Sequence, residues 1–173
     1  MSYDSCILEV YYMGAKFLVI EKENITYSYR YVFAKMLKSQ GKVKGELNKK
    51  ADRCKAICFA YYNGELAAIG ALKIKTKSVF SISKADLSSL ESEFEWELGY
   101  IYTVPKYQGK GLAQNVVAAL LESFEGDHLM ATTEVSKNPR MVRILENNGF
   151  KLHGKPWKSN IHGNDLGLFL KFK

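Results

Sequence analysis

Residues 97–113 read ELGYIYTVPKYQGKGLA and place a strand-like run, a short glycine-containing loop and the start of a helix in direct succession. The run continues to Pro105, which predicts a strand that ends there. Gly109 and Gly111 flank Lys110 immediately before the helical pattern. The first N–H groups of a helix have no partner within the helix and carry the positive end of its dipole. This order therefore favours binding of a pyrophosphate through main-chain donors.

The loop does not match two well-known nucleotide-binding motifs. No Gly-Lys-Ser/Thr follows, so it is not a Walker loop. Gln114 stands where the dinucleotide fingerprint needs its third glycine. A Gly-x-Gly between a strand and a helix is, by itself, more typical of a tight strand-to-helix turn than of phosphate binding.

Outside this stretch, apolar periodicity predicts strands and helices in alternation. The predicted strands are residues 6–20, interrupted at Gly14, and 56–62, 66–74, 128–135, 150–153 and 166–172, and the predicted helices are 27–39, 111–124 and the short segment from Asn138 to Gly149. Asn63-Gly64 predicts a type I′ turn between two of the strands. Residues 76–95 are rich in polar side chains, and we interpret them as an exposed connection.

Length and composition indicate one ordinary globular domain. The chain has 173 residues, of which 47% are hydrophobic and 25% charged, and it contains no low-complexity tract or internal repeat. No linker separates the predicted elements. We therefore expect a single α/β domain over residues 1–173.

The N-terminus and the cysteines point away from export. The first six residues lack the basic start and apolar core of a secretory signal. No apolar run approaches the about 20 residues that a membrane span needs. The three cysteines, Cys6, Cys54 and Cys58, form no C-x-x-C pair. We expect reduced thiols in a cytoplasmic protein, with no metal site and no membrane partner.

Charge is unevenly distributed along the chain, whose formal net charge is +7. Residues 35–55 hold eight basic and two acidic side chains, while residues 86–97 hold five acidic side chains and no basic one. The basic segment could meet phosphates of a nucleotide or of RNA, or form a solvated face. The acidic segment could attract a cationic substrate, or serve as a solubilising loop.

The loop and its surroundings resemble the GNAT family of N-acetyltransferases. Residues 108–113 match that family's loop pattern Gln/Arg-x-x-Gly-x-Gly/Ala, and residues 97–107 are similar to its fourth strand and loop entry. The segment from Asn138 to Phe150 is similar to its second cofactor segment, which begins with Asn at a helix start and ends in Gly-Phe. The resemblance covers residues 97–150, about a third of the chain.

The resemblance implies an α/β fold whose mixed, largely antiparallel central sheet splays after strand 4 and carries helices on both faces. It implies acetyl-CoA as co-substrate, with the pantetheine arm pairing with strand backbone and the pyrophosphate held by main-chain N–H groups. Asn138 would contact the pantetheine arm, and a plain N-cap role for it can hold at the same time. The implied cofactor-binding residues are Thr103, Val104, Gln108, Gly109, Lys110, Gly111, Leu112, Ala113 and Asn138.

The resemblance also suggests catalytic roles. A lysine-type amine has a pKa near ~10.4, so a general base helps it attack a thioester. Glu97 lies where several family members keep a base glutamate, although a surface role is the alternative. Many members use as acid a tyrosine seven residues after the Asn, but Leu145 stands here and cannot donate a proton. The candidates to replace it are Tyr100, Tyr102, Ser136, His153 and His162, of which we retain Tyr102, with strand packing as the alternative for the tyrosines.

The implied activity is direct acetyl transfer to an amine of a small molecule, peptide or protein, with backbone N–H groups of Thr103 or Val104 facing the developing oxyanion. One alternative is a toxin-like member that acetylates aminoacyl-tRNA, which the basic segment motivates. Nucleic acid is therefore left open as a partner, although the missing tyrosine counts against it. Another alternative is a non-catalytic acyl-CoA sensor, which Leu145 motivates. Homodimerisation, frequent in the family, is also left open.

Overall fold

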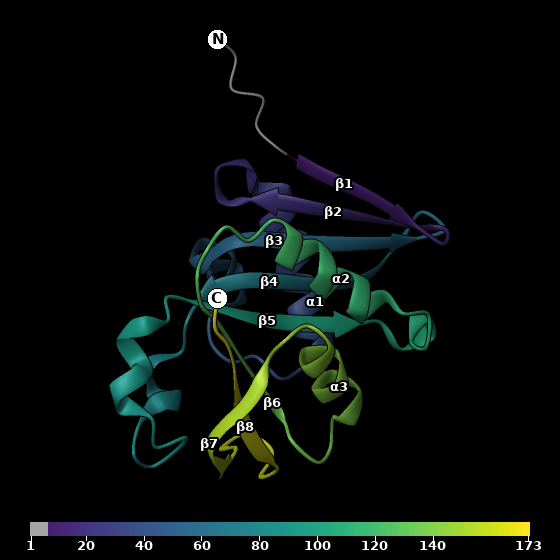
Figure 1. Ribbon diagram of the computed structural model, residues 1–173. Helices are drawn as coiled ribbons and strands as arrows, with labels where there is room; N and C mark the ends of the chain where they lie inside the picture. Colours follow the sequence, from purple (N-terminus) through teal and green to yellow (C-terminus); the bar gives the residue numbers. More distant parts are fainter. Residues whose placement is uncertain (1–6) are drawn as a thin grey trace. The chain divides into compact units, whose positions relative to one another are not determined.

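The computed structural model describes residues 7–173, so the expectations for Cys6 and the N-terminal six residues lie outside the described part (Figure 1). The described chain forms two compact units. Unit 1 consists of residues 7–73 and Tyr100–Phe124, and unit 2 of Ile74–Gly99 and Glu125–Lys173. We describe each by itself, and the single domain stays a prediction. Across residues 7–173, no helix combines the length and the apolar composition that a membrane span requires.

The strands of unit 1 follow chain order in the sheet, and the first four pair antiparallel (Figure 1). Its strands are β1 (Ile7–Tyr12), β2 (Ala15–Glu21), β3 (Cys54–Tyr62), most of β4 (Glu65–Ile74) and the second half of β5 (Trp96–Thr103). The β3–β4 turn has positive φ at both central residues, 49° at Asn63 and 80° at Gly64. This is the type I′ geometry that the sequence predicts.

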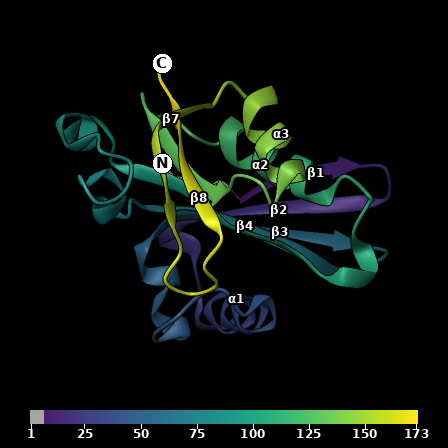
Figure 2. The ribbon, with the colours of Figure 1, turned by 90° about the horizontal axis from the view of Figure 1, so that it is seen from below.

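Two helices cover opposite faces of this sheet, as Figure 2 shows: α1 (Tyr27–Gln40) and α2 (Leu112–Glu122). On the α1 face, Phe33 and Leu37 are fully buried in one cluster with Phe59 of β3. On the α2 face, Gly70 of β4 makes room for the helix, because a Cβ there would lie 2.5 Å from Val116 Cγ1. The close approach of α2 therefore depends on a glycine.

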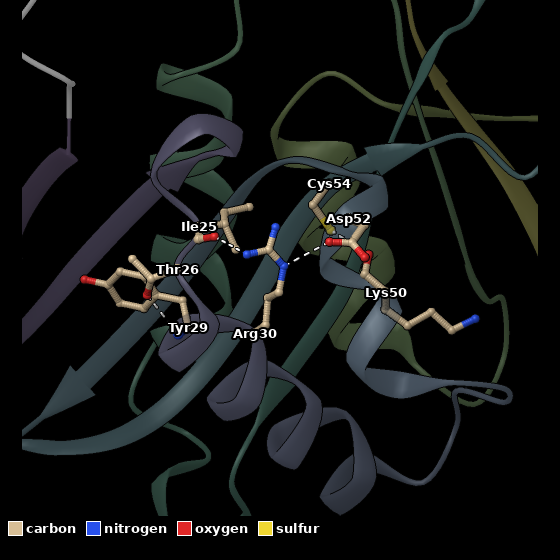
Figure 3. Close-up of polar contacts among 7 residues, drawn as sticks. All are labelled: Ile25, Thr26, Tyr29, Arg30, Lys50, Asp52 and Cys54. Atoms are coloured by element: carbon tan, nitrogen blue, oxygen red, sulfur yellow. Dashed lines mark hydrogen bonds and ion pairs between the residues drawn. The ribbon is translucent and has the colours of Figure 1, made fainter.

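The start of α1 is fastened to the segment that follows it (Figure 3). Thr26 caps the helix by accepting a hydrogen bond from the Tyr29 N–H at 3.4 Å. Arg30 Nε donates to Asp52 at 2.9 Å, and the same guanidinium donates to the Ile25 carbonyl. Asp52 belongs to η3 (Ala51–Arg53), which follows η2 (Leu47–Lys49), so the basic segment contains two short 3₁₀ helices.

Unit 2 combines parallel and antiparallel pairing. It contains the first half of β5, β6 (Leu129–Glu134), α3 (Pro139–Asn147), β7 (Lys151–Lys158) and β8 (Asp165–Lys171). β6 and β7 pair antiparallel with β8, whereas β5 pairs parallel with β6. The parallel pairing ends at Leu98 and Ala131, although β6 continues to Glu134. The mixed, largely antiparallel sheet with its splay is thus confirmed.

The prediction that residues 76–95 form an exposed connection is wrong in part. The segment contains η4 (Lys77–Phe80) and η5 (Ser88–Glu93), and it buries Val79, Phe80 and Phe94 against β6 and β8. Serines and acidic residues dominate its composition. The apolar positions have no regular spacing, so periodicity could not reveal them.

Strand β7 is longer than the predicted 150–153. It continues through Gly154, whose φ is +67°, and the Lys155 N–H donates to the Ala85 carbonyl at 3.0 Å. A Cβ at Gly154 would overlap that carbonyl, so the backbone contact requires glycine.

The two described cysteines are buried thiols in unit 1. Cys54 and Cys58 are 1% and 0% exposed, and burial raises the pKa of each thiol to about 12. Nearby Lys73 partly offsets the rise at Cys54, and the backbone N–H of Leu18 does so at Cys58. Because reactivity requires the thiolate, both are expected to be inert in the folded protein.

We predict that, in a Cys6→Ala background at pH 8, maleimide labels neither cysteine in the native state and both in guanidinium. The pKa of each thiol is higher in the folded protein than in the unfolded chain, so the free energy of unfolding is at its full value below about pH 8.5. It falls as the pH rises toward 12, by about 1.4 kcal/mol per pH unit for each thiol. Urea unfolding at pH 8.5 and 10.5 measures this slope, and Cys54→Ala/Cys58→Ala should be shallower. Rapid native labelling would contradict the assigned burial.

Candidate functional site

The glycine loop of unit 1 joins β5 to α2 through one 3₁₀ turn. Strand β5 ends at Thr103, η6 (Pro105–Tyr107) follows, and α2 begins at Leu112. Gly109 and Gly111 have φ of +79° and +73°, in the left-handed region that favours glycine. Gly111 is the N-cap of α2, so the helix begins one residue later than predicted.

The first turn of α2 lacks the side-chain cap that the neighbouring α-helices have. Thr26 caps α1 and Asn138 caps α3, but Gly111 offers no side chain to the orphan N–H groups of α2. A Cβ placed at Gly109 would meet no atom within 4 Å, and one at Gly111 would meet only Asn115 Nδ2, at 3.6 Å. Unpaired amides, a helix dipole and open space together suit a bound anion.

Lys110 is held over an aromatic ring that the sequence did not suggest. Its Nζ lies 4.9 Å from the centre of the Tyr62 ring, and Tyr62 in turn lies 5.8 Å from Tyr107. Lys106 and Tyr107 both hydrogen-bond Glu65 of β4. The loop therefore rests on the β3–β4 turn, and a cation–π contact holds the Lys110 ammonium group over the Tyr62 ring.

The end of β5 in unit 1 distinguishes between the N–H groups of Thr103 and Val104, the two expected main-chain donors to the ligand. The Val104 N–H donates to the Ala67 carbonyl of β4 at 2.8 Å, so this amide is already used. Successive N–H groups of a strand point to opposite sides, which directs the Thr103 N–H away from β4. Of the two, Thr103 fits a role toward a ligand better.

The tyrosines of β5 pack against α1. Tyr100 meets Phe33 edge-on at 5.6 Å, and Lys73 Nζ lies 5.4 Å from its ring. Its φ of +57° is rare for a residue with a side chain and marks a local distortion of the strand. Tyr102 is half-buried against the same cluster. Packing thus accounts for both rings, and a catalytic role for Tyr102 stays a prediction.

Glu97 is a buried carboxylate in unit 2, 6% exposed. Its Oε2 accepts two hydrogen bonds from Thr76, one from the main-chain N–H and one from the hydroxyl, both at 2.9 Å. Two donors fix the orientation of this carboxylate. Glu95, two residues before it, is exposed, and its carbonyl accepts from the Lys75 N–H. Thr76 lies 21 residues away along the chain, where no sequence pattern marked it.

Asn138 caps α3, as its position predicts. Its Oδ1 accepts from the Met141 N–H at 3.3 Å, and its Nδ2 contacts Thr133 Oγ1 of β6 at 3.4 Å. On the same helix Leu145 is fully buried. The position at which the resemblance implies a tyrosine that acts as the general acid is therefore part of the apolar core.

The remaining acid candidates are distributed over unit 2. His162 Nε2 lies 3.4 Å from Glu134 at the end of β6, and Asn164 donates to the other oxygen of this carboxylate at 3.0 Å. His153 contacts the Lys151 carbonyl through Nδ1 at 2.8 Å, and Ser136 is exposed. The Glu134–His162 pair has no sequence signature, because its partners are 28 positions apart in different elements.

The site residues thus fall into two groups. Thr103 to Ala113 form one continuous strand–loop–helix start in unit 1, and Glu97 and Asn138 lie in unit 2. Uncapped amides behind left-handed glycines are an arrangement that suits anion binding. A family model described as "Acetyltransferase (GNAT) family" matches residues 22–150. The chain therefore belongs to the GNAT acetyltransferase family.

Solved structures agree with this fold. Naa50 from Arabidopsis thaliana, in complex with the bisubstrate analogue CoA-Ac-MVNAL, has a TM-score of 0.65 at 13% identity, covering 93% of this chain and 100% of that chain. The protein yncA from Salmonella typhimurium, with its cofactor acetyl-CoA, has a TM-score of 0.62 at 13% identity, covering 92% and 94%. A GNAT-family acetyltransferase from Streptococcus pneumoniae has a TM-score of 0.58 at 17% identity, covering 90% and 98%. A sequence search of curated proteins finds no match.

We predict that Gly111→Glu lowers the affinity for acetyl-CoA by at least about tenfold, because a carboxylate would face the phosphates. Gly41→Glu is the matched control. Gly41, the C-cap of α1, has φ 72° and ψ 6°, against 73° and 8° at Gly111, so both variants strain the backbone equally. Calorimetric titration measures the two dissociation constants, and equal values would refute the placement of the phosphates.

Proposed function

We propose that this chain transfers the acetyl group of acetyl-CoA to an amine, directly and within a ternary complex. The observation that supports this most is the uncapped N-terminus of α2, open beside Gly109 and Gly111, in a chain of the GNAT family. These residues have the donors and the space that a pyrophosphate needs.

Unit 1 would hold the carrier through its main chain. The N–H groups from Gly109 to Ala113 would bind the pyrophosphate, and Lys110 would add positive charge. The N–H of Gln108, expected to join them, already donates to the Pro105 carbonyl at 3.2 Å. Thr103 would pair with the pantetheine arm or donate to the acetyl carbonyl oxygen as negative charge develops. In unit 2, Asn138 would reach the arm through the second lone pair of its Oδ1, because a carbonyl oxygen can accept two hydrogen bonds.

Glu97 would act as the general base. The two bonds from Thr76 hold its Oε2, and a carboxylate has further lone pairs with which to accept a proton, directly or through one water. Burial keeps bulk water away from the proton transfer. In the transfer from acetyl-CoA, the acceptor nitrogen loses one proton and bonds to the carbonyl carbon of the acetyl group. The carbon–sulfur bond breaks, and the leaving thiolate takes up one proton.

That last proton cannot come from Leu145, which is buried and apolar. We assign it to solvent or to Tyr102, the candidate retained from the strand. A CoA thiolate is a tolerable leaving group, so a weak acid suffices.

A thiol-release screen with acetyl-CoA tests the activity. The acceptors are small amines, polyamines, peptides with free α- and ε-amines, and aminoacyl-tRNA, with an amine-free reaction as control. Release of CoA that depends on one acceptor class supports the proposal and names the substrate. Tight acetyl-CoA binding with no release across the panel would favour the sensor alternative instead.

We predict that Glu97→Gln lowers kcat by about 10²–10⁴-fold while leaving the acetyl-CoA dissociation constant unchanged. The amide oxygen of Gln can still accept from Thr76, so the fold is preserved. Glu95→Gln, an exposed change two residues away, is the control and should retain full activity. The pH–rate profile of Glu97→Gln should also lose its acidic limb. A wild-type profile in that variant would exclude Glu97 as the base.

A further inference from the structure

The positive charge of this protein is concentrated in one segment of unit 1. Residues 27–55 contain nine basic and two acidic side chains, so they alone account for the formal charge of +7, and the rest of the chain is balanced. Both acids of the segment already pair within it. Glu46 contacts Lys49 at 2.5 Å, and Asp52 contacts Arg30 at 2.9 Å. A surplus this localised creates a strong positive potential over a single surface.

The solvent face of α1 carries aromatic rings as well as charge. Tyr27, Tyr31, Lys35 and Lys38 follow one another at spacings of four, four and three residues, which places them along one side of the helix. Tyr27 is 82% exposed and Tyr31 is 54% exposed. Lys35 Nζ lies 5.5 Å from the Tyr31 ring centre. These four side chains, here called the α1 stripe, extend over about 16 Å.

The α1 stripe differs from an ordinary solvated helix face. Such a face usually interleaves acidic and basic residues, whose i,i+4 pairs stabilise the helix. Residues 27–40 contain no acidic residue. The exposed rings of Tyr27 and Tyr31 contribute little burial of apolar surface to the stability of the fold. The opposite face of α1 supplies the buried Phe33 and Leu37. Packing therefore explains the inner face of α1 and leaves the rings of the stripe unexplained.

We propose that the α1 stripe, together with the basic residues up to position 55, binds a single-stranded nucleic acid. Unstacked bases would lie on the rings of Tyr27 and Tyr31, and phosphates would meet Lys35 and Lys38. A single strand alternates flat bases with negatively charged phosphates, and the rings and lysines of this surface are complementary to both. A duplex keeps its bases stacked and would leave the rings without partners. An anionic membrane favours apolar side chains, which α1 directs into the core.

The surface is held in one conformation. The Thr26 cap and the Arg30–Asp52 pair fasten both ends of the segment, and Figure 3 shows the Lys50 side chain extending away from that pair. A surface fixed before binding loses little entropy when a flexible strand docks on it. This proposal does not depend on the acetyl transfer, since its ligand binds the stripe whether or not acetyl-CoA is present.

Fluorescence anisotropy with a fluorescein-labelled U12 RNA, titrated without acetyl-CoA at 50–200 mM NaCl, tests the lysines. Each phosphate contact contributes a slope of about −0.7 to log K against log salt. Lys35→Glu/Lys38→Glu should weaken binding at least tenfold and flatten the slope by about 1.4. Lys77→Glu/Lys151→Glu makes the same charge change at exposed positions in unit 2 and should stay within twofold. Equal losses in both double variants would overturn the proposal.

The rings are tested at fixed salt. Tyr27→Ala/Tyr31→Ala should weaken U12 binding at least about fivefold with the salt slope unchanged, since stacking on an aromatic side chain contributes about 1–3 kcal/mol per base. Tyr27→Phe/Tyr31→Phe keeps the rings and should bind like the wild type. All four side chains are exposed, so thermal unfolding should be unchanged. Unaltered binding by the alanine variant would reduce the stripe to a general polyanion surface and refute the stacking.

Other partners are tested by direct comparison. A labelled dT12 should bind comparably to U12. A 12-base-pair duplex, heparin and vesicles with 30% phosphatidylserine should bind without dependence on the tyrosines. If the vesicles bound in a tyrosine-dependent way and neither single strand bound, the proposal would be overturned and the partner would be a membrane. Acetyl-CoA titration of the same variants separates the two proposals, because the stripe variants should bind it normally.

Discussion

The chemistry assigned to this protein depends on a few main-chain N–H groups that the fold leaves without acceptors. A helix always has such groups at its start, and the usual solution is a side-chain cap, which Thr26 and Asn138 supply to the other two α-helices of residues 7–173. At α2 the N-cap is a glycine, and the preceding loop turns through left-handed conformations that keep other side chains away. The unsatisfied donors carry a free-energy cost, which the proposed binding of a pyrophosphate would offset.

The position of those donors is set by packing elsewhere in unit 1. Gly70 allows α2 to lie close against β4, and the hydrogen bond from Val104 to Ala67 fixes where β5 ends and the loop begins. The side chains of Lys106 and Tyr107 then fasten the loop to Glu65 beside the β3–β4 turn. A binding loop made mostly of backbone gains its precision from such neighbours, because it has few side chains of its own to orient it.

Much of this architecture could be predicted from sequence because its signals are local. Asn63-Gly64 determines its own turn, Gly41 ends α1, and Asn138-Pro139 begins α3, each through the conformational preference of one or two residues. The loop of residues 108–113 was recognisable because the family's loop pattern places small residues at fixed spacing. Burial of Leu145 could be anticipated from its place on the apolar face of a short helix.

What the sequence could not supply are contacts between distant segments. The Thr76 donors to Glu97, the Tyr62 ring under Lys110 and the Glu134–His162 pair join residues with no mutual spacing rule. Phe80 and Phe94 were assigned to an exposed connection because single apolar residues among serines and acids resemble any surface loop. The exposed tyrosines of α1 were equally hidden, since an aromatic residue on a helix usually faces the core.

The bond between Thr76 and Glu97 gives the connection of residues 76–95 an unexpected importance. The threonine lies just beyond β4 and just before η4, so its direction follows from the register in which the chain leaves the strand. One residue inserted there would turn the hydroxyl to the other side and remove a hydrogen bond from a carboxylate buried in the interior. Chains that share this fold but differ in that spacer must orient a carboxylate at this position of β5 by other means. The number of residues between β4 and η4 could therefore distinguish family members that hold a carboxylate in this way from members that do not.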